Sequence, residues 1–210
     1  MATRLFLIRH GSTDWNVLQR YCGFINIALN ARGKIQAKRL QRRLKNETVH
    51  KVYASDRKRA IQTAEIVFKG RDVEKVADLR EMHFGIFEGL TYKQIMEKFP
   101  RIYKKWAGNP FANAIPSGES LTILKKRVVK AFKRIILCHP NQTIAVVCHG
   151  GAISAFINHV LKSKEFWKHI PDSASLTIMD AKNKKIKIRL LNDISHLSGL
   201  KIDAVKFKKG

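Results

Sequence analysis

The chain has 210 residues, enough to bury one core, so we expect a single domain over residues 1–210. Its composition is 45% hydrophobic, without a low-complexity tract or a fixed repeat, which excludes a solenoid and a long disordered region. The net charge of +25 favours anionic partners (phosphorylated small molecules, nucleic acid or an acidic membrane surface) without choosing among them, and a host whose proteins are basic accounts for it equally well.

The first apolar run, within MATRLFLIRHG, is too short for a signal peptide. No segment approaches the length needed to span a membrane. Three cysteines without a C-x-x-C pair argue against a disulfide framework or a Cys-rich zinc site. We therefore expect a cytoplasmic protein with no membrane partner.

Short apolar runs alternate with helical patterns along the chain. The runs that predict strands lie at 4–8, 51–55 and 143–148. The first and third lack in/out alternation, which is typical of strands covered on both faces. Apolar residues at helical spacing predict helices at about 33–45, 57–69, 119–138 and 151–161. Two later runs are expected to form strands, in a hairpin, at 175–181 and 185–191.

This alternation predicts an α/β fold, a three-layer sandwich in which helices flank a mostly parallel central sheet. Residues 80–118 depart from the pattern, because they are rich in Gly, Pro and aromatic residues. We expect them to form an irregular, partly helical excursion over the active site, at one edge of the sheet.

The ends of the predicted strands carry the functional signal. Two strands end on histidine followed by glycine, in LIRHG and VVCHGG, and the third runs into ASDRKRAIQTA. In open α/β sheets ligands bind beyond the carboxyl ends of the strands, so we expect His10, Arg59 and His149 to meet there. Each motif alone is weak, since a histidine can be a core residue and an arginine a surface charge, but the three together indicate one site.

Phosphoryl transfer to a side chain needs a nucleophile, cationic donors and an acid for the leaving group. His10 can be the nucleophile, because a neutral imidazole nitrogen attacks phosphorus without prior deprotonation. Guanidinium forks and the first turn of a helix suit phosphate oxygens. The candidate phosphate ligands are Arg9, Asn16, Arg59, His149 and Gly150. Physical reasoning alone leaves the acid open among Glu81, Glu88 and Glu119.

Five segments in order, RHGSTDWN, SDRKRAIQTA, LREMHFGIFEG, PSGES and VCHGG, resemble the histidine phosphatase superfamily, also called phosphoglycerate mutase-like. The resemblance runs from about residue 3 to residue 196. It implies that His10 becomes phosphorylated and that Glu81 protonates the leaving group and then activates water. It assigns the phosphate pocket to Arg9, Asn16, Arg59 and His149. Arginines and a histidine take the place of a divalent ion, so neither metal nor cofactor is expected.

FGIFEG resembles the F-G-x-W-E-G of the phosphatase branch, with Phe87 in the place of tryptophan, and the chain lacks the insertion typical of mutases. PSGES and the late LNDISHL resemble α-ribazole-5′-phosphate phosphatase and broad-specificity relatives. The sequence thus predicts a metal-independent phosphatase of small-molecule phosphate monoesters. The alternatives are a phosphoglycerate mutase and, more remotely, a nucleic-acid-binding pseudoenzyme, which no stacking motif supports. The oligomeric state is open, with a homodimer as one option.

Overall fold

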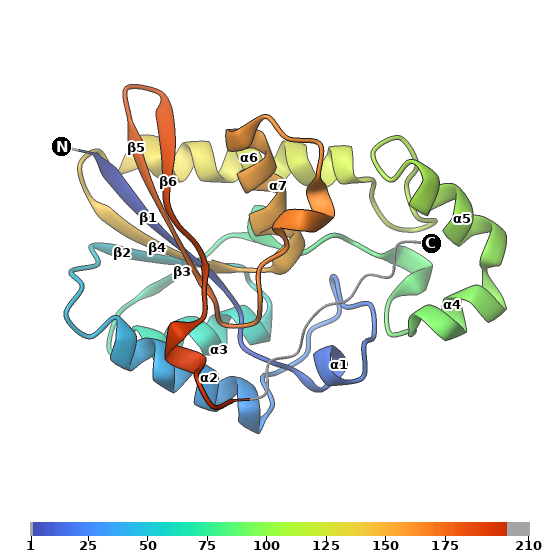
Figure 1. The fold of residues 1–210 in the computed structure, drawn as a ribbon, viewed down its shortest axis with the longest axis horizontal. Coiled ribbons are helices and arrows are strands. Elements are labelled where there is room, and N and C mark those ends of the chain that lie inside the picture. The colour runs from blue at the N-terminus through green and yellow to red at the C-terminus, as the bar shows by residue number, and fades with distance from the viewer. Residues whose placement is uncertain (1, 201–210) are drawn as a thin grey trace.

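The computed structural model describes residues 2–200, and its centre is one six-stranded sheet in the order β3-β2-β4-β1-β5-β6 (Figure 1). Strands β1 to β4 run parallel to one another, and β5 and β6 form a hairpin whose first strand pairs antiparallel with β1. The sheet is therefore mostly parallel, as predicted. The strands are β1 (Thr3–Arg9), β2 (Lys51–Ala54), β3 (Val73–Lys75), β4 (Thr143–Cys148), β5 (Leu176–Lys182) and β6 (Lys185–Asp193).

Both faces of the sheet are buried at its centre, because successive side chains of β1 point to opposite faces and the four from Leu5 to Ile8 are all apolar and buried. Leu5 and Leu7 join a core cluster with α6 (Leu121–Cys138) and α7 (Gly150–Leu161), whereas Phe6 and Ile8 join a second cluster with α2 (Ala31–Arg43) and α3 (Lys58–Val67). Figure 1 shows these helix pairs on either side of the sheet. The three-layer prediction is confirmed, and these four helices match the predicted ones to within a few residues.

The sequence did not indicate β3. This three-residue strand pairs with β2 at the edge of the sheet, and two of its residues, Glu74 and Lys75, are exposed. An edge strand with one partly buried apolar side chain, Val73, carries no hydrophobic run to detect.

The segment 80–118 contains two short helices, α4 (Tyr92–Lys98) and α5 (Pro100–Gly108), which lie at one end of the molecule in Figure 1. A capping box between Thr91 and Gln94 begins α4, and Pro100 occupies the first turn of α5, a position where its missing N–H is harmless. The ring centroid of Phe87 lies within 6.3 Å of the ring centroids of Phe99, Tyr103 and Trp106. Aromatic packing thus supplies the order that the sequence pattern did not show.

Five short elements complete the described chain: α1 (Asp14–Val17), and 3-10 turns at Ala77–Leu79, Gly85–Phe87, Phe166–His169 and Ser195–Leu197. Within residues 2–200 no helix has the length and apolarity that crossing a membrane requires.

Candidate active site

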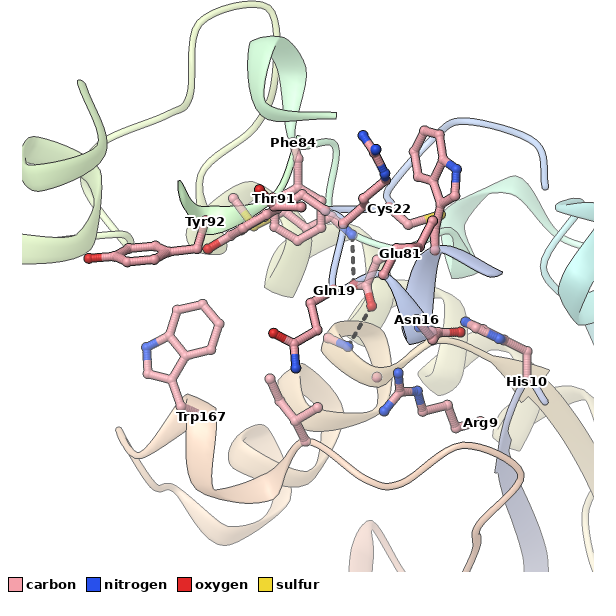
Figure 2. Close-up of a pocket in the computed structure, with 18 of the residues that line it drawn as sticks. Arg9, His10, Asn16, Gln19, Cys22, Glu81, Phe84, Thr91, Tyr92 and Trp167 are labelled. Carbon is pink, nitrogen blue, oxygen red and sulfur yellow. Dashed lines mark hydrogen bonds between the residues drawn. The ribbon is translucent and has the colours of Figure 1, made fainter. Parts of the chain in front are cut away.

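A pocket of about 400 Å³ opens where the parallel strands β1 and β4 end (Figure 2). Its lining includes five of the predicted site residues, which are Arg9, His10, Asn16, Glu81 and Gly150. Arg59 and His149 are fully buried and lie behind His10, which separates them from the pocket. The ring centroids of His10 and His149 are 5.1 Å apart. The fold therefore brings all seven predicted residues together.

His10 follows the last residue of β1, and its N–H donates to the carbonyl of Cys148 at 2.9 Å, which extends the pairing with β4. Its Nδ1 lies 2.7 Å from the Gly11 carbonyl oxygen. A carbonyl can only accept, so Nδ1 carries the proton and Nε2 keeps a lone pair. Burial, with the charges of Arg59 and Arg9, holds the pKa of His10 well below its ordinary value. His10 is therefore held as a neutral imidazole with a lone pair on Nε2.

His149, at the end of β4, connects this imidazole to a buried cation. Its Nδ1 accepts from Arg59 Nε at 3.2 Å, and its Nε2 lies 2.8 Å from Ser55 Oγ, which fixes the ring. Burial first, and then the charge of Arg59, keep the pKa of His149 well below its ordinary value. Arg59 also donates to the carbonyl of Gly23 at 2.7 Å. A guanidinium held this way is a preorganised source of positive potential next to His10.

The other two phosphate-binding candidates are held by local structure. Arg9 donates to the Pro171 carbonyl at 2.6 Å, and its guanidinium lies beside the first turn of α7, where a Cβ on Gly150 would be 3.5 Å from Arg9 Cζ. Asn16 completes a capping box at α1, in which its Oδ1 accepts the Thr13 N–H at 3.0 Å. Because that oxygen is committed, the amide N–H₂ of Asn16 is the donor left for a ligand.

Glu81 reaches the pocket from the segment before α4. Its two carboxylate oxygens accept N–H groups of Met82 and Gly151, both at 2.8 Å. Burial raises the pKa of Glu81, and these two hydrogen bonds oppose the rise. The contact requires glycine at 151, since a Cβ there would lie 2.2 Å from Glu81 Oε1. A carboxyl with a raised pKa beside a neutral imidazole fits the acid of a phosphoryl transfer.

The two rival glutamates hold loops in place. Glu88 accepts the N–H groups of Phe24 and Ile25 at 2.6 and 2.9 Å, next to the carbonyls that bind Arg59. Glu119 pairs with Arg127 and accepts the N–H of His83 at 2.9 Å. Neither lines the pocket. Of the three glutamates, only Glu81 lines the pocket that His10 also lines.

Sequence reasoning missed the wall of the pocket opposite His10. Figure 2 shows Tyr92 and Trp167 at the end of the pocket away from His10, with Phe84 and Gln19 between. These residues come from the irregular segment 80–118, from α1's flank and from the turn at Phe166–His169. The density of aromatic residues in 80–118 was the available signal. Ser55, which fixes His149, had none.

Comparison with known proteins agrees with this geometry. The family model described as "Histidine phosphatase superfamily (branch 1)" matches residues 5–194. The chain belongs to this superfamily. As a histidine phosphatase, it is 30% identical to phosphoserine phosphatase 1 of Hydrogenobacter thermophilus, over 97% of this chain and 98% of that one. It is also 30% identical to a 2,3-bisphosphoglycerate-dependent phosphoglycerate mutase of Blochmanniella pennsylvanica, over 83% and 91% of the two chains.

Among solved structures, the α-ribazole phosphatase of Shigella flexneri superposes with a TM-score of 0.84 at 31% identity, covering 91% of this chain and 96% of that one. The predicted phosphoglycerate mutase-like fold is thus confirmed, and the family places the chain among enzymes, in the phosphatase class. The relatives' names differ in their substrates, and identities near 30% leave this histidine phosphatase's own substrate open.

Proposed function

We propose that the chain hydrolyses small-molecule phosphate monoesters through a phosphohistidine at His10. The observation that carries the proposal is that His10 and Glu81 line one pocket. His10 is neutral there, and because its Nδ1 is the nitrogen that faces Gly11, the lone pair on Nε2 is left for the substrate. In the first step Nε2 attacks phosphorus, the ester P–O bond breaks and Glu81 gives its proton to the leaving oxygen. In the second step water attacks phosphorus, Glu81 takes a proton from that water, and the N–P bond breaks to release phosphate.

The surrounding donors would stabilise the charge on the transferring group. Arg9, Asn16 and Gly150 at the start of α7 line the pocket, and Arg59 adds its charge from behind His10. Positioning and electrostatic stabilisation of this kind supply most of the catalysis in phosphoryl transfer.

The test compares His10→Asn with His50→Asn, since His50 is an exposed histidine far from the pocket lining. Acid-labile, base-stable labelling by a ³²P-monoester, together with phosphate release, should occur in the wild type and in His50→Asn and disappear in His10→Asn. Equal labelling of both variants would overturn the nucleophile. Conversion of 3- to 2-phosphoglycerate without net phosphate release would establish the mutase instead.

We further propose that the preferred alcohol has a flat, apolar body, as α-ribazole does. The pocket wall opposite His10 is built from Tyr92, Trp167 and Phe84, and aromatic faces of this kind bind ring systems. Phosphoserine, with an ammonium and a carboxylate on a short chain, makes little use of such a wall.

The substrate proposal is tested by kcat/KM for α-ribazole-5′-phosphate, 1-naphthyl phosphate and phosphoserine. Trp167→Ala should raise KM for the two aromatic esters by about fivefold, since stacking on one ring contributes roughly 1 kcal/mol, and leave phosphoserine turnover unchanged. A wild-type preference for phosphoserine would overturn the substrate class while leaving the phosphohistidine mechanism intact.

A further inference from the structure

Helix α6 presents an outward line of side chains that the pocket does not use. Ile123, Lys126, Lys130, Lys133 and Leu137 follow one another at spacings of 3, 4, 3 and 4 residues, which places them on one face of the helix. All five are exposed, with Ile123 at 52% and Leu137 at 79%. We call these five residues the α6 stripe, and it spans about 21 Å along the helix.

The middle of the α6 stripe is a concentrated positive charge. Helix α6 contains no Asp or Glu, and Lys125 and Arg134 flank the three lysines. Within residues 2–200 none of these five cations takes part in an ion pair. His159 of α7 lies in the same shallow groove, and its pKa is lowered by burial and by the charges of Lys133 and Lys125. The positive charge of α6 therefore acts on a neighbouring side chain, the imidazole of His159.

The ends of the stripe are aliphatic. Ile123 precedes the lysines and Leu137 follows them, and the partly buried Val129 lines the groove together with the lysines. Exposed aliphatic groups beside cations suit the boundary between phospholipid headgroups and acyl chains. They add nothing to the binding of a nucleic-acid backbone, and no aromatic side chain in the stripe could stack on bases.

We propose that the α6 stripe adsorbs to bilayers that carry anionic phospholipids, with its lysines among the phosphates and Ile123 and Leu137 in the headgroup boundary. The sequence predicts no membrane partner, and no helix of the described residues could span one. Adsorption by one face of a folded helix is a mode of binding that does not require a spanning segment. The proposal is independent of the chemistry at His10.

The test is co-sedimentation with vesicles of phosphatidylcholine containing about one third phosphatidylserine, at low and high salt. Lys126→Gln/Lys130→Gln/Lys133→Gln should weaken binding on the order of 100-fold, because each lysine near an anionic surface contributes about fivefold. The matched control removes three exposed cations from α2, on the other side of the sheet: Lys34→Gln/Lys38→Gln/Arg42→Gln. It should change binding by less than about fivefold, since those cations lie outside the stripe.

Leu137→Gln should weaken vesicle binding severalfold at high salt, where screening removes most of the lysines' share. Both α6 variants should keep wild-type turnover of a soluble monoester. Equal losses in the α2 and α6 triple variants would overturn the proposal, since bulk charge would then explain adsorption. A larger effect of the α6 substitutions on RNA gel shifts than on vesicles would overturn it in favour of nucleic acid.

Discussion

Substituting Gly151 by Ala should separate catalysis from stability. The added Cβ would lie 2.2 Å from Glu81 Oε1, whereas carbon–oxygen contacts in proteins settle at about 3.3 Å or more. The carboxyl must therefore retreat by about 1 Å, a displacement that can lower a rate about 100-fold. Stability should not fall with the rate, since Ala is favoured over Gly within a helix such as α7 by up to about 1 kcal/mol.

The assay is the burst of alcohol released in a rapid-quench experiment, which isolates the phosphorylation of His10. With an alkyl phosphate the burst rate should fall about 100-fold, because an alkoxide needs the proton of Glu81 to leave. With p-nitrophenyl phosphate it should fall little, because that anion leaves unaided. Gly108→Ala is the control, since nothing lies within 4 Å of its Cβ. A full-rate burst with the alkyl ester, or equal losses for both esters, would refute the role of Glu81.

Four further outcomes follow from the same structure. The first step needs neutral His10 and protonated Glu81, and the pKa of His10 is lowered whereas that of Glu81 is raised. The pH–rate profile should therefore be shifted to acid: its acid limb lies below pH ~6.5, and the rate falls as pH rises through the pKa of Glu81. An alkaline optimum would contradict this. Arg127→Ala leaves Glu119 unpaired and removes the donor to the Glu81 carbonyl, so urea unfolding should show a loss of about 3 kcal/mol. Phe132→Ala, in the stack with Phe156, should lose about 4 kcal/mol by the same measurement while KM stays constant. Dialysis against EDTA should leave p-nitrophenyl phosphate hydrolysis unchanged, and a loss that Mg²⁺ restores would argue against the metal-free mechanism.

The part of the site that lies at the strand ends could be predicted, because local sequence patterns show where those strands lie. Apolar runs indicated β1 and β4. Because parallel strands end at the same edge of a sheet, His10 and His149, which follow these two strands, were expected to lie together. Arg59 followed from its place in the first turn of α3. Each of these positions depends on sheet topology alone.

The remaining features depend on long-range contacts that leave no periodic trace. Glu81, Glu88 and Glu119 look alike in the sequence, and only their partners in the fold distinguish the glutamate that lines the pocket from the two that hold loops. The aromatic wall joins Tyr92 to Trp167, which are far apart in the chain and outside any regular strand. Predicting them would have required the packing of the segment 80–118 itself.

The place of β1 in the middle of the sheet bears on how the enzyme is made. β1 leaves the ribosome first, but the strands on its two sides, β4 and β5, begin at Thr143 and Leu176. A nascent chain therefore has no sheet in which to place His10 until most of it has been synthesised. Such distant pairings slow folding and favour its completion after release. His10 is therefore synthesised long before the strands that hold β1 in place, so incomplete chains carry His10 without the pocket that it lines.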